Sequence, residues 1–336
     1  MVKLLKHKFI FLLLLPLMLN GREKQNKSNT TNWGFYAHKR INRLAIFTLP
    51  PEMFGFYKEH MEYLTEHAVD PDKRRYAMEG EAQRHYIDID HYVTGREDPF
   101  EKMPRKWEEA VAKFTEDTLQ AYGIIPWHLK SMKFKLQSAF EKKNVDLILK
   151  YSADIGHYIG DAHVPLHTTE NYNGQLTNQK GIHGLWESRL VEINSNNYDY
   201  FVGKAQYINS IEKFIWETIK ASHQAVDSVL RIEQQVTDDL KIDTKYSFEE
   251  RGNKTVRVYS YEFSEAYHSR MNGMVERRLR ASIQAIASFW YTAWIDAGQP
   301  DLSILQNTPP SMAMMEELKA LDLHYEKGKH KGRICE

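Results

Sequence analysis

The chain has 336 residues, of which 42% are hydrophobic and 12% aromatic, a composition that excludes a disordered chain and supports a sizeable core. Its 45 basic and 45 acidic residues balance, so its charge does not mark a dedicated polyanion-binding protein. The single cysteine, Cys335, excludes an intrachain disulfide and a zinc site built from several thiolates, so any metal site must rest on His, Asp and Glu.

The N-terminus has the pattern of a signal peptide. Three lysines among the first eight residues precede an apolar run over residues 9–19, which is too short to cross a bilayer unaided. We therefore expect residues 1–20 to be a signal peptide and the protein to be extracytoplasmic, either periplasmic or secreted. An uncleaved membrane anchor is the alternative. Residues 21–32 are polar without an apolar period and predict a linker.

From residue 33 onward most segments have helical periodicity. Residues 107–123 carry apolar side chains three and four apart and end at a glycine, and residues 131–163 and 207–236 continue in the same way. Closer to the C-terminus one apolar stripe at helical spacing predicts a buried helix that ends before Gly298. The residues of this stripe are Val275, Leu279, Ile283, Ile286, Trp290 and Trp294.

Residues 246–260 alone predict β structure, as a small hairpin that turns at Gly252–Asn253. The sequence therefore predicts an all-α fold with one small β-hairpin. We expect a multi-helix single domain over residues 33–302, followed by a basic, loose tail over residues 303–336.

Two pairs of metal-capable side chains lie at helical spacing. His157 and Asp161 are four residues apart, as are His183 and Glu187, so each pair shares one helix face. His167 follows Asp161 by six residues, past Pro165, where the helix is expected to end. Any one pair alone is more often a structural hydrogen bond. Because buried charged groups are costly unless they are paired or bind a metal, both pairs and His167 within about thirty residues predict a metal site.

Further candidate ligands lie upstream of these pairs. They are His38, Asp70, Asp72, His85 and Asp88. Imidazole nitrogens and carboxylate oxygens without competing thiols suit Zn²⁺. The Asp70–Asp72 region has a simpler interpretation, as a helix N-cap and a solvated turn.

The sequence HYIGDAHVPLH (157–167) followed by GIHGLWESRL (181–190) resembles the core signature of the zinc-dependent phospholipase C and single-strand nuclease superfamily. That signature is His-x3-Asp-x5-His followed by His-x3-Asp/Glu. The resemblance extends to WGFYAH (33–38), HYID (85–88) and the aromatic helix IASFWYTAW (286–294), so it covers most of residues 33–300.

The resemblance implies a mostly helical fold with a trinuclear zinc cleft. One zinc ion would take Asp70, His85, His157 and Asp161, and Asp161 would bridge to another ion completed by His38 and Trp33. The remaining ion would take His167, His183 and Glu187. Asp70 is preferred over Asp72 because its fifteen-residue step to His85 fits the family better, which leaves Asp72 as the alternative. Asp88 matches an acidic residue that contacts substrate or supports the site in relatives.

The implied activity is zinc-dependent hydrolysis of phosphodiester bonds by zinc-bound hydroxide in an in-line attack. A zinc pair bridged by Asp161 lowers the pKa of bound water, so no side-chain nucleophile is required. Asp70 or Asp88 would orient the attacking water. In the family the residue that corresponds to Trp33 is the mature N-terminus. Cleavage near residue 20 would leave about a dozen residues before Trp33, which makes the zinc ion that uses Trp33 the weakest expectation.

The substrate is either a phospholipid head group or a single-stranded nucleic acid. Glu187 as the last ligand and the absence of disulfides favour the phospholipase C branch, whereas HYID and the Asp70–His85 step suit the nuclease branch as well. Asn171, Tyr172 and Asn173 are candidate substrate-binding residues in either case. A non-catalytic zinc-binding protein of the same fold is a third hypothesis, against which the complete ligand set argues. We expect a monomer without a dedicated protein partner.

Overall fold

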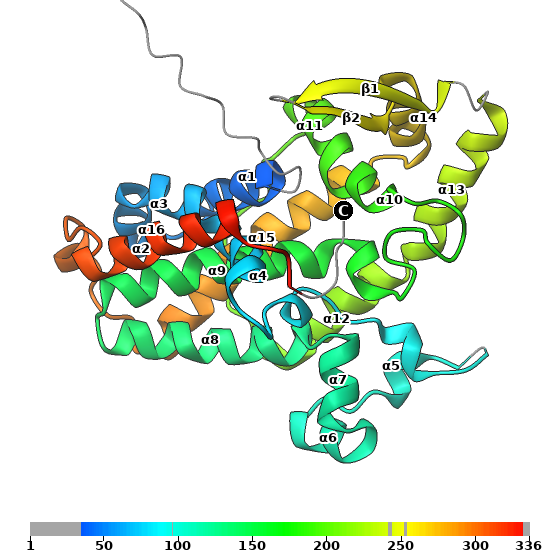
Figure 1. The fold of residues 1–336 in the computed structure, drawn as a ribbon. Coiled ribbons are helices and arrows are strands. Elements are labelled where there is room, and N and C mark those ends of the chain that lie inside the picture. Colours follow the sequence, from blue (N-terminus) through cyan, green and yellow to red (C-terminus); the bar gives the residue numbers. More distant parts are fainter. Residues whose placement is uncertain (1–34, 96, 241–243, 252–253, 332–336) are drawn as a thin grey trace, which may run out of the picture.

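The computed structural model describes residues 35–95, 97–240, 244–251 and 254–331 (Figure 1). The expected signal peptide, the linker and Trp33 lie outside these residues. Within them the fold is helical with one small hairpin, as the sequence predicts. The helices are α1 (Phe35–Ile46), α2 (Pro51–Glu59), α3 (Met61–Glu66), α4 (Asp70–Ala77), α5 (Pro99–Lys102), α6 (Trp107–Phe114), α7 (Glu116–Tyr122), α8 (Ile125–Glu141), α9 (Val145–His163), α10 (Ile182–Gly184), α11 (Leu190–Asn194), α12 (Ile211–His223), α13 (Val226–Asp239), α14 (Tyr261–Arg270), α15 (Met274–Asp296) and α16 (Met312–Lys327).

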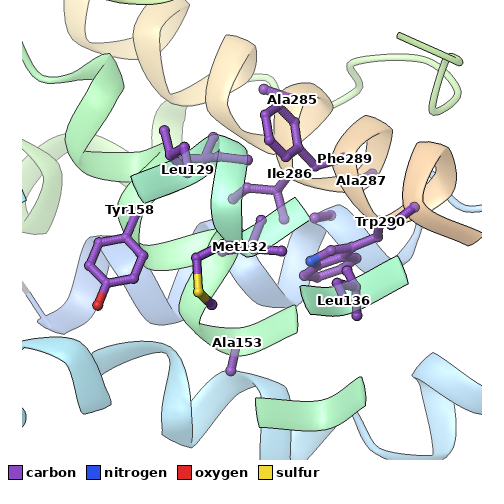
Figure 2. Packing of buried hydrophobic residues seen from close by; sticks show 14 of the residues in the cluster. Leu129, Met132, Leu136, Ala153, Tyr158, Ala285, Ile286, Ala287, Phe289 and Trp290 are labelled. Atoms are coloured by element: carbon purple, nitrogen blue, oxygen red, sulfur yellow. The ribbon is translucent and has the colours of Figure 1, made fainter. Parts of the chain in front are cut away.

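Helix α9 is the centre of the fold. It contacts α1, α8, α12 and α15, and every residue from Ser152 to His163 is buried. The apolar positions of α8 and α15 close over it in the main core, as Figure 2 shows for Leu129, Met132, Leu136, Ile286, Phe289 and Trp290. A helix this deeply buried would ordinarily be apolar throughout. Its polar residues must therefore be satisfied by one another or by a ligand.

A second apolar cluster lies under the hairpin. Strands β1 (Tyr246–Arg251) and β2 (Lys254–Tyr259) pair antiparallel, with Tyr246 opposite Tyr259. Tyr259 joins Val229 of α13 and Phe263 of α14 in this cluster. Because a two-stranded hairpin is marginal alone, its packing on α13 and α14 holds it in place.

Three stretches with helical periodicity in the sequence each contain two helices instead of one. Residues 107–123 form α6 and α7, separated at Thr115, whose φ of +69° ends α6 and whose hydroxyl accepts from Thr118 N to begin α7. Residues 131–163 belong to α8 and α9, with Asn144 capping α9 through Leu147 N. Residues 207–236 contain α12 and α13. The apolar stripe of residues 275–294 is one helix, α15, as predicted.

The segment expected to be a loose tail contains the sixteen-residue helix α16, which packs on α4. Lys73 pairs with Asp322 at 2.8 Å, and Tyr325 lies edge-on to Tyr76. Beyond the helix, Lys331 N donates to Arg75 O at 2.8 Å. None of the helices among the described residues is both long and apolar enough to span a membrane.

Candidate metal centre

His157 and Asp161 lie on one face of α9, four residues apart. The same face approaches α1, because Gly156 and Gly160 alternate with them along the helix. A Cβ at Gly156 would stand 2.0 Å from Asn42 Oδ1, and one at Gly160 would stand 2.8 Å from His38 Nδ1. Only glycine permits this approach, which brings His38 of α1 to the His157–Asp161 face.

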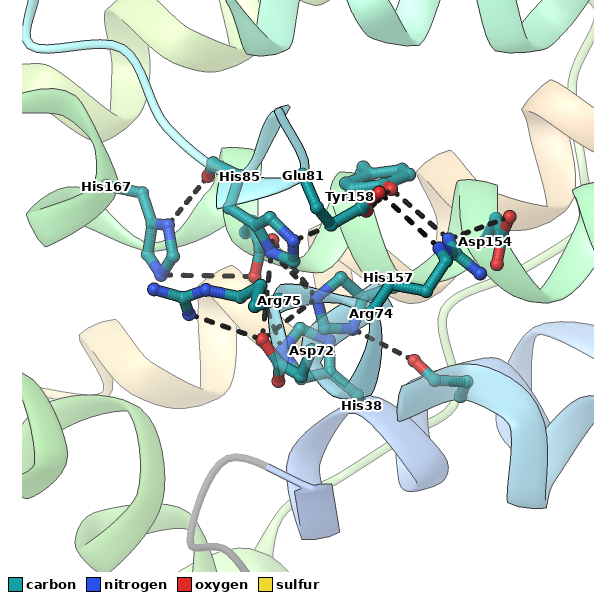
Figure 3. Close-up of polar contacts among 12 residues, drawn as sticks. His38, Asp72, Arg74, Arg75, Glu81, His85, Asp154, His157, Tyr158 and His167 are labelled. Atoms are coloured by element: carbon teal, nitrogen blue, oxygen red, sulfur yellow. Dashed lines mark hydrogen bonds and ion pairs between the residues drawn. The ribbon is translucent and has the colours of Figure 1, made fainter. Parts of the chain in front are cut away.

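Eight buried or nearly buried side chains form one continuous cluster. Their potential ligand atoms fall into four overlapping groups, and within each group they lie within 4.8 Å of one another. The groups are His38–Asp72–His157, His85–His157–Asp161, His167–His183–Glu187 and His38–Asp161–Glu187. His38, His157, Asp161 and Glu187 each belong to two groups, so the groups share ligands as a polynuclear site requires. Figure 3 shows the part of this cluster around His38, Asp72, His85, His157 and His167.

Three imidazoles are held in one orientation by the main chain. Nδ1 lies 2.9 Å from Ala68 O in His157, 2.7 Å from His85 O in His167 and 3.1 Å from Tyr172 O in His183. Since a carbonyl only accepts, each Nδ1 carries the proton and each Nε2 is left facing the carboxylates. This is the usual second hydrogen bond of a metal-ligating histidine.

His85 and His157 present ring nitrogens to each other. His85 Nδ1 lies 3.1 Å from His157 Nε2 and 2.9 Å from Asp161 Oδ2. With Nδ1 of His157 donating to Ala68, its Nε2 has a lone pair that must meet a proton or a cation. Nδ1 of His38 and Nε2 of His85 are also buried without a hydrogen-bond partner among the described residues. The donor set of imidazole nitrogens and carboxylate oxygens therefore fits Zn²⁺.

His183 and Glu187 are joined by a π-helical turn. His183 lies in α10, and Glu187 lies in the π turn η5 (Leu185–Arg189) that follows it, with Nε2 of His183 2.7 Å from Glu187 Oε2. Such turns are rare and frequent at functional sites. Glu187 also lies 3.3 Å from His167 Nε2 and 3.2 Å from His38 Nε2, so it joins the two ends of the cluster.

The pKa values of the cluster's side chains depend on one another. Burial opposes charge on His38, but the Asp161 and Glu187 carboxylates raise its pKa to about 10. Burial likewise opposes charge on His85, whose pKa Asp161 and Glu81 raise to about 9. Conversely, burial raises the pKa of Glu187, but His167, His183 and His38 together outweigh it and lower that pKa well below its ordinary value.

The structure places Asp72, rather than Asp70, in the cluster. Asp72 Oδ1 lies 3.7 Å from His157 Nε2 and 3.8 Å from His85 Nδ1. The Asp70 carboxylate instead binds His67 at 2.8 Å and Lys73 at 3.2 Å. Both aspartates lie in the first turn of α4. Side chains two residues apart on a helix point about 200° away from each other, so only one of the two can face the cluster. The preference for Asp70 as ligand and water-orienting base does not agree with this geometry.

Arg75 adds a positive charge beside the cluster. It lies one helical turn after Asp72, with Nη1 3.5 Å from Asp72 Oδ1, and Figure 3 shows its guanidinium extending toward His167. Burial raises the pKa of Asp72, but His157, His85 and Arg75 together lower it. The side chain of Asp72 is 22% exposed, more than any other member of the cluster, so this end is the one open to solvent.

A second set of charged residues lies next to His85 and is linked by ion pairs and a hydrogen bond. Glu81 is fully buried, with Oε1 3.7 Å from His85 Nε2, and it accepts from the Tyr158 hydroxyl. Arg74 lies 3.0 Å from Asp154 and 3.5 Å from Glu81. Sequence reasoning did not single out Glu81. Its position four residues before His85 was the available signal, because the two face the same way on a helical turn.

The residues expected to bind substrate have other partners. The Asn171 amide bonds Thr177 Oγ1 and Leu176 N, and Asn173 Oδ1 accepts from Gly181 N and His183 N. Tyr172 contributes its carbonyl to His183. These three residues shape the loop that orients His183. Asp88 is buried and belongs to none of the four groups of ligand atoms. Burial raises the pKa of Tyr92, and the negative charge of Asp88 raises it further.

Comparison with known proteins identifies one matching family. The family model described as zinc dependent phospholipase C matches residues 37–229, which include all eight residues of the cluster. Among solved structures, alpha-toxin of Clostridium perfringens from avian strain SWCP is 12% identical with a TM-score of 0.45, over 82% of this chain and 66% of that one. Alpha toxin of Clostridium absonum is 12% identical with a TM-score of 0.43, over 78% and 64%. The chain thus spans less than two thirds of each toxin. No curated protein matches it.

Proposed function

Because this chain belongs to the zinc dependent phospholipase C family, we propose that it is a periplasmic or secreted enzyme that hydrolyses the phosphodiester bond of phospholipids at the cluster described above. The observation that carries the proposal is the set of four overlapping groups of buried imidazoles and carboxylates, three of whose histidines are oriented by main-chain carbonyls. Extracytoplasmic location rests on the basic and apolar N-terminal pattern.

Zinc ions would be held by His38, Asp72, His85, His157, Asp161, His167, His183 and Glu187. Shared membership of His38, Asp161 and Glu187 in two groups each supports more than one ion, and three remains our proposal. When bound, zinc supplies Lewis-acid polarisation of the phosphoryl group and activation of water. Trp33 lies outside the described residues and stays a proposed ligand.

The chain's own residues supply orientation and charge. Ala68, His85 and Tyr172 fix three imidazoles through their carbonyls, which turns Nε2 of each ring toward the other residues of the cluster. Arg75 is buried beside Asp72, the least buried residue of the cluster, where a phosphodiester anion would enter and where a guanidinium favours two phosphoryl oxygens at once. Asp72, at the same end, can accept a proton from an attacking water, the role first expected of Asp70 or Asp88.

The test is metal analysis and turnover on purified protein loaded with zinc. Phosphatidylcholine vesicles, a chromogenic phosphodiester and single-stranded DNA are assayed in parallel, together with His157→Ala. We expect release of a phosphorylated head group from the vesicles, and loss of both zinc and turnover in His157→Ala. The matched control is His163→Asn, since His163 lies on the same helix but bonds Ile159 O and belongs to none of the four groups of ligand atoms.

Three results would contradict the proposal. Cleavage of DNA without cleavage of lipid would favour a nuclease, and bound zinc without turnover on any substrate would favour a zinc-binding protein. Retained hydrolysis in His157→Ala would remove the cluster from the mechanism.

A further inference from the structure

A polar groove lies between α12 and α15, away from the ligand atoms of the cluster. It is a cavity of about 570 Å³. Lys213 and Thr218 belong to its α12 wall, Arg278 and Ala281 to its α15 wall, and residues 206–210 close one end. Cavities of several hundred Å³ are the size that holds small organic ligands.

Arg278 is the charged group at the inner end of this groove. Nε donates to His163 O at 2.8 Å, and Nη2 donates to the Ser222 hydroxyl and, at 3.5 Å, to Thr218 O. All three acceptors are neutral. Among the described residues no carboxylate lies within ion-pair distance of Arg278, and burial lowers the pKa of its guanidinium to about 10.

Arg278 is partly buried, and a cation in such a place without a counter-ion is unfavourable unless hydrogen bonds satisfy all of its N–H groups. The contacts with described residues use Nε and Nη2 and leave the N–H groups of Nη1 for a ligand. Glu217, the acidic residue of the groove, is 3.7 Å from Lys213, so that pair is neutral and the groove keeps the charge of Arg278. A guanidinium fork fits the oxygens of a phosphate or carboxylate.

The other end of the groove is the N-terminus of α12. Ser210 caps it by accepting from Lys213 N, and the positive end of the helix dipole points there. Eight residues of α12 separate Ser210 from Thr218, about 12 Å along the axis. Between these ends the walls include Phe214 and Ala285. The groove therefore offers positive potential at both ends and apolar surface between them.

We propose that this groove binds a small organic oxyanion, a phosphate ester or a carboxylate, with its charged group on Arg278. The site is separate from hydrolysis, since none of the residues that line the groove belongs to the metal cluster. Arg278 and His163 also line a smaller cavity, of about 30 Å³, whose far wall includes His38 and Glu187. Arg278 thus stands between the groove and the candidate metal centre.

The test is titration calorimetry on the zinc-loaded full chain with two probes, glycerol 3-phosphate and hexanoate. Glycerol and hexanol serve as uncharged controls. Arg278→Gln removes the cation, and Ala281→Trp fills the groove from an exposed position while the guanidinium stays in the chain. Arg277→Gln removes an exposed charge from the same helix and is the matched control. Because Arg278→Gln also removes helix-end contacts, Ala281→Trp keeps the test valid if that variant fails to fold.

We expect binding of at least one charged probe to weaken about tenfold or more in both groove variants and to be unchanged in Arg277→Gln. Which probe binds tells a phosphate ester from a carboxylate. Binding that persists in Ala281→Trp would place the anion outside the groove and overturn the proposal. Binding of neither probe to the wild-type protein would overturn it as well.

Discussion

At the scale of single residues, Asp70 and Asp72 point to different sides of α4, and only one of them lies where it could bind the metal. The Asp72 carboxylate faces His157 and His85, whereas that of Asp70 faces His67 and Lys73. We expect Asp72→Asn to lower the amount of zinc retained after dialysis and to reduce turnover by at least about tenfold. Asp70→Asn is the matched control, with unchanged zinc content by atomic absorption. Equal zinc loss in both variants would contradict the assignment.

The titration of His38 and His85 gives a second prediction. Their pKa values rise from the ordinary 6.5 to about 10 and about 9 in the metal-free fold. A raised folded-state pKa adds stability that is complete below the unfolded value and is lost as pH rises through the folded value. The melting temperature of metal-free protein should therefore fall from about pH 7 to pH 10.

Zinc displaces the same protons, so its apparent affinity should rise over that range, by about tenfold per pH unit for each proton released. Differential scanning fluorimetry of the metal-free and zinc-loaded forms from pH 6 to pH 10 checks both statements. A metal-free protein whose melting temperature rises steadily through pH 9 would contradict the pKa directions.

At the scale of elements, the approach of α1 to α9 depends on Gly160. A Cβ there would meet His38 Nδ1 at 2.8 Å and Ile41 Cδ1 at 2.9 Å. We expect Gly160→Ala to push α1 outward, to destabilise the fold by about 1–3 kcal/mol and to lose the metal group that needs His38. Urea unfolding and zinc content are the measurements. Gly184→Ala, at a helical glycine with open space around it, should change neither.

Helix α16 gives a prediction at the same scale, because it covers the side of α4 opposite Asp72. Deleting residues 309–336 removes buried Met314, the Lys73–Asp322 pair and the Lys331–Arg75 contact. The melting temperature should fall and zinc should exchange faster from the Asp72 end. Asp322→Asn alone should have little effect, since that carboxylate is 55% exposed and exposed ion pairs contribute little. Full stability after the deletion would show that α16 does not support α4.

The sequence predicted the elements whose pattern is local. The stripe from Val275 to Trp294 and the His157–Asp161 pair follow from helical spacing alone, and both lie on single helices. The step to His85 favoured Asp70 over Asp72, whereas the structure turns Asp72 toward the cluster, because sequence spacing does not fix which face of α4 packs on α9 and α16. The sequence missed α16 because, of its residues, only Met314 is buried, so its apolar pattern is weak. Thr115 broke the helix expected over residues 107–123 through its backbone conformation, which periodicity does not register.

At the scale of the whole molecule, the cluster ties the fold together. Its residues come from α1, α4, α9, α10 and three connecting segments, so metal binding would link parts of the chain that are far apart in the sequence. Treatment with a chelator should lower the melting temperature by about 5 °C or more, because a ligand bound only by the folded state stabilises it. Zinc should restore the transition in calorimetry, and magnesium should not. An unchanged transition would show that the fold does not use the metal.

The spread of the cluster along the chain also bears on how the protein reaches its native state. Helices α8 and α9 are adjacent in sequence and can form an early antiparallel pair. His38, His85 and Glu187 join them only after long loops close, which is the slow part of such a search. The ligand positions are therefore complete only at the end of folding, and the rate of zinc uptake during refolding reports the time at which the last of these long-range contacts forms.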